Sequence, residues 1–295
     1  MLRSAVRKAK ALLWGGARPA TKAKNLAHTI NFPDFTLDIC PSDYGGLMYN
    51  GREAYEESQS PLYSLIRQSL SPQYVFDVGA NYGFSSLIFH KNFPAAHIYA
   101  IEPSPNLLHY LQANLSSTPD TNISIINKVC GNEVSTQVQF GLNPRSSQDN
   151  RVLAQTGWIS VPVPQTSIDE IAKQIPCLSA VFMKVDTQGF ELQVFLGAEK
   201  TLARCSNWLV KTEFAPFCLL SQGTDPHVFL EYLLSNYSVY ELPSRILFEC
   251  DKLTNILSRP LSKERAVSFI KHVEGLNRDK TGWVDLIVKP KDGDG

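Results

Sequence analysis

A short apolar strand followed by a glycine-rich turn constrains the fold of this chain more than any other feature; it lies within the stretch YVFDVGANYGFSS, residues 74–86. Residue types that favour buried strands come first and end at Asp77, and Gly79 and Gly83 follow. An apolar stretch with helical spacing begins at Phe84. Strand, tight turn and helix form the start of an α/β unit, in which a ligand can approach the bare backbone and the amides that open the helix.

The turn differs from the common nucleotide-binding fingerprints. The nicotinamide pattern G-x-G-x-x-G requires glycine where Asn81 and Phe84 stand, and the phosphate-binding pattern G-x-x-x-x-G-K-[ST] does not occur in the sequence. The turn instead reads D-x-G-x-N-x-G, with an acid closing the strand. A carboxylate there suits a cationic ligand better than a pyrophosphate. S-adenosylmethionine, which carries an α-amino group and a sulfonium but no phosphate, is such a ligand. The alternative is an ordinary turn that binds nothing.

Composition narrows the class of protein. The 295 residues include 28 Lys+Arg and 28 Asp+Glu, and this balance does not favour a nucleic-acid partner. The six cysteines are scattered without a C-x-x-C pair, which predicts reduced thiols in a cytoplasmic protein without a zinc site or disulfide framework. No apolar run in the sequence approaches the roughly 18 residues of a membrane span.

The sequence predicts three segments. Residues 1–29 form a basic extension, because positions 1–24 hold seven Lys or Arg and no acid, with apolar residues along one helical face. We expect this extension either to contact an anionic membrane surface peripherally or to remain a solvated arm. Residues 30–73 form a lead-in or cap with a short strand in Phe32–Ile39 and a helix in Tyr63–Leu70. The main domain is expected at residues 74–290.

Strands and helices alternate along the main domain. After the strand at residue 74, further strands are expected at residues 97–101, 123–127, 180–186, 208–213, 237–242 and 283–288. This alternation predicts an α/β, Rossmann-like, mostly parallel sheet with helices on both faces. Residues 135–163 alternate between apolar and polar types around a polar centre, which indicates an inserted hairpin or lid.

Acids close four of these strands: Asp77, Glu102, Asp186 and Glu213. Ligands bind at the carboxyl ends of the strands in such sheets, so we expect the four carboxylates to lie on one rim. Glu102 follows the glycine turn by about 20 residues, the spacing at which an acid binds ribose hydroxyls in dinucleotide folds. The alternative for Glu102 is a solvated residue at a strand end. Asn132 follows another strand-to-loop corner, which is expected near the adenine.

Four motifs carry a family resemblance: FDVGANYGFSS, IEPSP, TSIDEI and MKVDTQGFELQVFLGAEKTL. From about Val75 to Val239 the chain resembles the FkbM-type methyltransferases of the class I S-adenosylmethionine-dependent superfamily. Thr187 stands where that family more often has an aliphatic residue. The resemblance implies a seven-stranded sheet ending in an antiparallel hairpin. It also implies O-methylation of a hydroxyl on a sugar, a glycolipid or polysaccharide, or a natural-product scaffold.

Matched motif by motif, the resemblance assigns cofactor binding to Asp77, Gly79, Asn81, Gly83 and Glu102. It also places Asp186 beside the transferred methyl group.

A sugar hydroxyl is a weak acid, so a general base should assist its methylation. Asp186 is the first candidate, Glu213 the second and His227 the third, because His227 begins a helix near the same rim. The alternative for His227 is a surface histidine. Glu191 is expected either to support Asp186 or to contact the acceptor. No histidine cluster indicates a metal site.

Two other functions remain open at this point. A nicotinamide-dependent oxidoreductase could use a similar fold, although the glycine pattern disfavours it. A non-catalytic cofactor-binding domain would keep the fold, but would have no need of four carboxylates at the rim.

Overall fold

The fold is known from a computed structural model that describes residues 27–116, 122–242 and 252–291. A seven-stranded sheet with the order β11-β12-β10-β9-β3-β4-β5 forms its centre. β12 is antiparallel to both neighbours and the other pairs are parallel, which confirms the predicted mostly parallel sheet with a final antiparallel pair. The strands are β3 (Tyr74–Val78), β4 (His97–Ile101), β5 (Ile123–Ile126), β9 (Ala180–Val185), β10 (Asn207–Phe214), β11 (Tyr237–Leu242) and β12 (Val284–Pro290).

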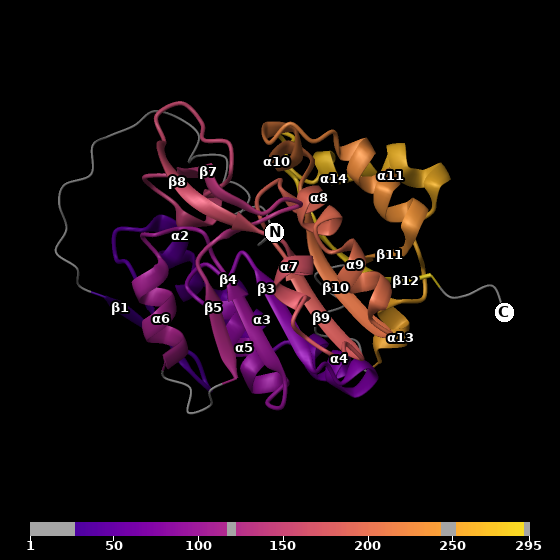
Figure 1. Cartoon of the computed structure of the whole chain (residues 1–295). Helices are drawn as coiled ribbons and strands as arrows, with labels where there is room; N and C mark the ends of the chain where they lie inside the picture. Colours follow the sequence, from indigo (N-terminus) through magenta and orange to yellow (C-terminus); the bar gives the residue numbers. More distant parts are fainter. Residues whose placement is uncertain (1–26, 117–121, 243–251, 292–295) are drawn as a thin grey trace.

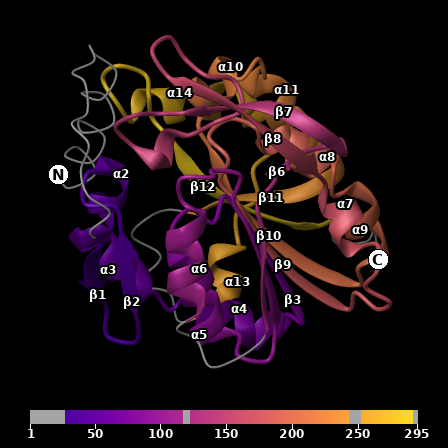
Figure 2. The same ribbon diagram turned by 60° about the vertical axis from the view of Figure 1, so that its left-hand side comes forward.

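Helices cover both faces of this sheet, as Figures 1 and 2 show. A hydrophobic core lies on each face of the sheet. Successive strand residues point to opposite faces, so in β9 Phe182 lies in one core (the Phe182 core) and Met183 lies in the other (the Met183 core). The Phe182 core contains residues of α4 (Leu62–Leu70), α5 (Phe84–Asn92), α6 (Leu108–Ser116) and α13 (Leu253–Ile256). The Met183 core contains residues of α7 (Ile168–Ala172), α8 (Glu191–Leu196), α9 (Glu199–Arg204), α10 (Pro216–Ser221), α11 (Pro226–Asn236) and α14 (Ala266–Gly275).

The N-terminal lead-in packs onto the Phe182 face. It comprises β1 (His28–Asn31), β2 (Thr36–Ile39), α2 (Tyr44–Leu47), the 3-10 turn η1 (Met48–Asn50) and α3 (Arg52–Ser58). The short strand expected in Phe32–Ile39 is present as β2. The sequence did not predict β1, which pairs with β2 in a hairpin that has Phe32 and Phe35 stacked 4.8 Å apart at its turn. β1 begins at His28, one residue before the end expected for the basic extension, and positions 1–24 lie outside the described residues.

A second sheet lies above the carboxyl ends of the central strands (Figure 1). β7 (Ser135–Leu142) and β8 (Ile159–Thr166) pair antiparallel in the segment where the sequence indicates a hairpin. β6 (Val129–Cys130) adds to β8 in parallel, so the insertion is a three-stranded sheet rather than a hairpin alone. Its connecting loop contains the 3-10 turn η2 (Ser147–Asp149).

After β4 the chain enters α6 at Leu108, and the 3-10 turn η3 (Lys263–Arg265) leads directly into α14. Among the helices of the described residues, none has the length and apolar character needed to cross a membrane.

Candidate active site

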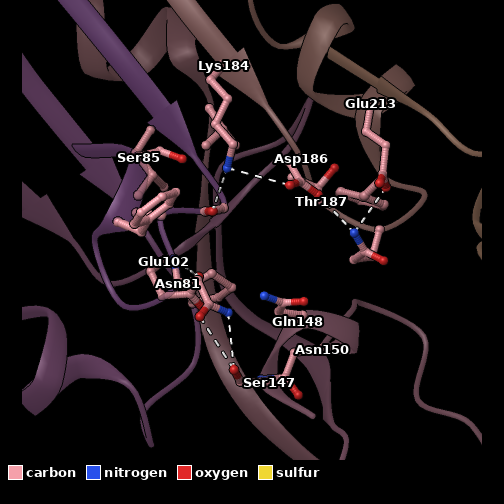
Figure 3. Close-up of a pocket in the computed structure, with 18 of the residues that line it drawn as sticks. Asn81, Ser85, Glu102, Ser147, Gln148, Asn150, Lys184, Asp186, Thr187 and Glu213 are labelled. Carbon is pink, nitrogen blue, oxygen red and sulfur yellow. Dashed lines mark hydrogen bonds and ion pairs between the residues drawn. The ribbon is translucent and has the colours of Figure 1, made fainter. Parts of the chain in front are cut away.

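A cavity of about 360 Å³ opens at the carboxyl ends of the central strands. Its walls come from the turn after β3, the ends of β4, β9 and β10, the loop of the second sheet, and the lead-in helices (Figure 3). The volume lies within the range of small-molecule sites. Both polar and apolar side chains contribute, so the cavity suits a ligand with one apolar end and one polar end.

The turn after β3 forms one edge of the cavity, where Gly79 and Asn81 line it. Both have positive φ, 81° and 52°. A Cβ on Gly79 would lie 2.0 Å from the carbonyl oxygen of Asp186, so only glycine lets the ends of β3 and β9 approach this closely. Asn81 tolerates the left-handed conformation, and its Oδ1 accepts a hydrogen bond from the Tyr82 backbone. Gly83 starts α5 and packs against Leu111, and it does not line the cavity.

Glu102 lies on the cavity wall with 4% of its surface exposed. Its Oε2 accepts the backbone N–H of Asn81 at 2.9 Å, and its Oε1 accepts that of Ser104 at 2.9 Å. Burial raises the pKa of Glu102 to about 7, although both amide donors act in the other direction. Each oxygen keeps a second acceptor site, because a carboxylate oxygen can accept two hydrogen bonds.

Asp77 is fully buried beneath the glycine turn and is not part of the cavity wall. Its Oδ2 accepts the hydroxyl of Ser86 at 2.6 Å, and its Oδ1 lies 3.5 Å from Nζ of Lys184. The direct cofactor contact expected for Asp77 is therefore not what the structure shows. Asp77 instead supports the turn from below.

Lys184 connects the turn to the rim. Its Nζ donates to the carbonyl of Gly79 at 3.0 Å and lies 3.7 Å from Oδ2 of Asp186. Burial opposes its charge, but Asp77 and Asp186 outweigh burial and raise the pKa of Lys184. Sequence reasoning did not select this residue, although a lysine inside the apolar strand AVFMKV was a visible signal.

Asp186 and Glu213 meet at the ends of β9 and β10. The Asp186 side chain is 40% exposed, whereas Glu213 is 6% exposed. Nε2 of Gln188 donates to Oδ1 of Asp186 at 2.8 Å and to Oε2 of Glu213 at 3.0 Å. All three residues line the cavity, so two candidate bases from separate strands share one site.

Glu191 lies behind this rim rather than in the cavity. It is 1% exposed, and its Oε1 accepts hydrogen bonds from the backbone and hydroxyl of Thr187 and from the backbone of Gly189. Of the two roles left open for Glu191, these contacts favour support of the Asp186 loop.

Two expected site residues lie elsewhere. Asn132 is exposed and outside the cavity wall, and its neighbours Val129 and Cys130 line the cavity instead. His227 is exposed at the start of α11, where its backbone N–H donates to the helix-capping Asp225. His227 does not belong to the cavity wall.

Several residues of the cavity wall were not predicted from the sequence, because they come from segments that lie far apart along the chain. The lead-in contributes Tyr49, Arg52 and Glu57, and β10 and β12 contribute Lys211 and Asp285, whose side chains lie 3.2 Å apart. No periodic pattern reveals that α3 folds back over β10. Among the described residues, no cluster of His, Cys, Asp or Glu has the arrangement of a metal site.

The segment Ser147–Asn150, which belongs to the inserted lid, lies across the cavity from Lys184 and Asp186 (Figure 3). The backbone N–H of Ser147 donates to Oδ1 of Asp43 at 2.8 Å, and the Tyr82 hydroxyl donates to Oδ2 of the same carboxylate at 2.8 Å. Asp43 also caps α2. One carboxylate therefore ties the lid, the lead-in and the glycine turn together.

Comparison with known families assigns the chain to a protein family. Residues 77–241 match the family model described as the methyltransferase FkbM domain. This match covers more than half of the chain, and the chain belongs to the FkbM methyltransferase family. It is therefore an S-adenosylmethionine-dependent methyltransferase, as the sequence predicted.

Solved structures resemble the chain only distantly. An O-methyltransferase from Streptomyces achromogenes, titled as involved in tomaymycin synthesis and in complex with SAM, has 11% identity and a TM-score of 0.44 over 80% of each chain. An O-methyltransferase from Bacillus cereus in complex with SAH has 10% identity and a TM-score of 0.43, covering 79% of this chain and 80% of that one. A putative O-methyltransferase from Klebsiella pneumoniae has 9% identity and a TM-score of 0.43 over 79% of each chain. No curated protein matches the sequence.

The residues present fit this cofactor. Glu102 offers acceptor sites for two ribose hydroxyls, and Ile101, Val129 and Cys130 form an apolar wall suited to an adenine. At the other end, the carboxylate of Asp186 suits a ligand with a positive charge. Glu102, Gly79 and Asn81 would hold the nucleoside part, and the cofactor would supply a methyl group on a sulfonium.

Proposed function

We propose that this methyltransferase O-methylates a hydroxyl of a sugar, a glycolipid or polysaccharide, or a natural-product acceptor. The observation that supports this most strongly is the half-exposed carboxylate of Asp186 at the end of β9, inside the cavity and beside Glu213. A carboxylate in this position can take a proton from an acceptor hydroxyl.

The chemistry makes few demands on the protein beyond alignment. Bound S-adenosylmethionine supplies an electrophilic methyl group, which an acceptor oxygen attacks in line with the departing sulfur. The cavity wall has to hold the acceptor oxygen in that line, which is a positioning effect. A carboxylate oxygen of Asp186 then receives the hydroxyl proton as general base. Lys184, with its Nζ 3.7 Å from Oδ2, places a positive charge beside this carboxylate.

The cavity wall is rich in hydrogen-bonding groups. Arg52, Glu57, Lys211 and Asp285 all line the cavity, and Lys211 and Asp285 are paired at 3.2 Å. Alternating donors and acceptors of this kind match the hydroxyl groups of a carbohydrate or polyol better than a purely apolar acceptor. This supports a hydroxyl-rich acceptor class.

Asp186→Asn tests the proposal, because it keeps the size of the side chain and removes its charge and basicity. We expect the turnover number to fall by about 10²–10⁴-fold, the range of a positioned general base, with little change in cofactor affinity. Release of S-adenosylhomocysteine would be followed over a panel of sugars, glycolipids and natural-product alcohols, and affinity by calorimetry.

His227→Ala is the matched control, since His227 lies outside the cavity, and its turnover should equal that of the unmodified enzyme. Near-normal turnover in Asp186→Asn with a loss in Glu213→Gln would transfer the role to Glu213. Equal losses of affinity and turnover in Asp186→Asn would make Asp186 a cofactor ligand instead.

A further inference from the structure

Gln188 occupies an unusual position between the two candidate bases. Its single amide nitrogen donates to Asp186 at 2.8 Å and to Glu213 at 3.0 Å, so each carboxylate receives one of its two N–H groups. Gln188 is 6% exposed. A neutral side chain thus joins two acids that end neighbouring parallel strands.

The backbone holds Gln188 in a conformation that glutamine rarely adopts. Gln188 has φ of 58° and Gly189 has φ of 108°. A Cβ on Gly189 would lie 2.2 Å from the carbonyl oxygen of Cys218, so α10 presses directly on this turn. The three hydrogen bonds to Glu191 Oε1 clamp the same turn from the other side. Strained backbone that neighbours enforce in this way is typical of functional sites.

The charged groups that surround Asp186 differ from those that surround Glu213. Asp186 faces Lys184 across 3.7 Å, and Tyr49 and the buried Glu191 lie within its electrostatic reach. Glu213 pairs in register with Asp285 of the adjacent strand β12, and that acid is itself paired with Lys211.

Asp186 and Glu213 are two like charges that both accept a hydrogen bond from one amide nitrogen. Two carboxylates that share a site tend to capture a proton, which would remove the base.

We propose that Gln188 is a positioning residue that holds Asp186 and Glu213 in one arrangement and keeps both of them ionised. Its N–H groups favour the charged form of each carboxylate, and its amide prevents the two from sharing a proton directly. The inference rests on the proposed function where it treats Asp186 as the general base. The hydrogen-bonded unit itself does not depend on the identity of the acceptor.

Gln188→Met tests the proposal, because methionine has a similar length and no donor. Protein labelled with ¹³C at the side-chain carboxyls would be titrated by NMR, with the two signals assigned from Asp186→Asn and Glu213→Gln. We expect the pKa of one of the two carboxyls to rise by about one unit or more in Gln188→Met. The acid limb of the kcat/KM profile should move by the same amount once an acceptor is found.

Gln222→Met is the matched control. Gln222 is 8% exposed and also uses its amide, but it bonds to the backbone of Leu153 and does not line the cavity. This variant should lose comparable stability and leave both carboxyl pKa values unchanged. Unchanged values in a folded Gln188→Met variant would overturn the proposal.

A measurement on the unmodified protein covers the case in which Gln188→Met does not fold. The side-chain amide protons of Gln188 should exchange slowly and shift at the pH where the two carboxyls titrate. Fast exchange without a pH response would overturn the proposal. If the Gln188 amide protons respond to the titration of the two carboxyls but Asp186→Asn retains turnover, then Asp186 is not the general base. The proposal that Gln188 positions the two carboxylates would remain valid in that case.

Discussion

Burial gives the two acids Glu102 and Asp186 different properties. Glu102 is 4% exposed and accepts two backbone amides, whereas the Asp186 side chain is 40% exposed to the cavity beside Lys184. Burial raises the pKa of Glu102 to about 7, so the ligand-free enzyme holds a proton on this carboxyl more readily at neutral pH than an exposed glutamate does. Hydroxyl donors prefer the ionised carboxylate, and cofactor binding should therefore be linked to loss of this proton.

The first residue-scale prediction follows from this linkage. Because the folded pKa of Glu102 is raised, the ionised form gains population as pH rises through about 7. Affinity for S-adenosylmethionine should therefore increase by about tenfold from pH 6 to pH 8. Titration calorimetry at several pH values measures this. Glu102→Gln should lose this dependence and keep only the part that belongs to the ligand's own groups; a variant with the full dependence would rule out Glu102.

At the scale of elements, the turn between β3 and α5 sets the geometry of the site. The approach of Gly79 to the carbonyl of Asp186 places the first and fourth strand ends of the chain's α/β core side by side. Sequence analysis identified this turn because its glycines and the flanking apolar periods are local features. It also predicted the central sheet, since alternating strands and helices restrict the topology to a few choices.

Gly79→Ala tests the close approach at this turn. Gly79 has φ of 81° and would place its Cβ 2.0 Å from backbone, whereas Gly157 has φ of 85° and nothing within 4 Å. Both substitutions carry the cost of a left-handed alanine, about 1 kcal/mol. Gly79→Ala should lower the free energy of unfolding by about 1–3 kcal/mol more than Gly157→Ala, measured by urea denaturation. Equal decreases in the free energy of unfolding for the two variants would show that the close contact between Gly79 and the Asp186 carbonyl has no energetic consequence.

The parts of the site that sequence could not predict are non-local. Asp77, at the end of a strand, was expected to face the ligand. However, α5 covers the face of the sheet on which Asp77 lies, and the hydroxyl of Ser86 in that helix donates a hydrogen bond to Oδ2 of Asp77. Arg52 and Glu57 reach the cavity only because the lead-in folds across the sheet. Asn132 and His227 follow elements that end near the rim, but both are exposed and lie outside the cavity wall, which no local pattern encodes.

At the scale of the whole molecule, the lead-in and the central sheet share one hydrophobic core, and the second sheet closes over both. Positions 1–24 lie outside the described residues, and we propose from their sequence that they attract the enzyme to anionic lipid. Deletion of positions 1–24 should leave cofactor affinity intact and reduce co-sedimentation with anionic vesicles at low salt. Absence of vesicle binding by the full chain would refute this role.

The most direct test of the account is a pair of calorimetric titrations of the unmodified protein, one with S-adenosylmethionine and one with NAD. We expect saturable binding of S-adenosylmethionine at a stoichiometry of about one, because the cavity at the rim suits one cofactor molecule. We expect no binding of NAD, because Asn81 and Phe84 replace two glycines of the nicotinamide fingerprint. Binding of NAD without binding of S-adenosylmethionine would contradict it.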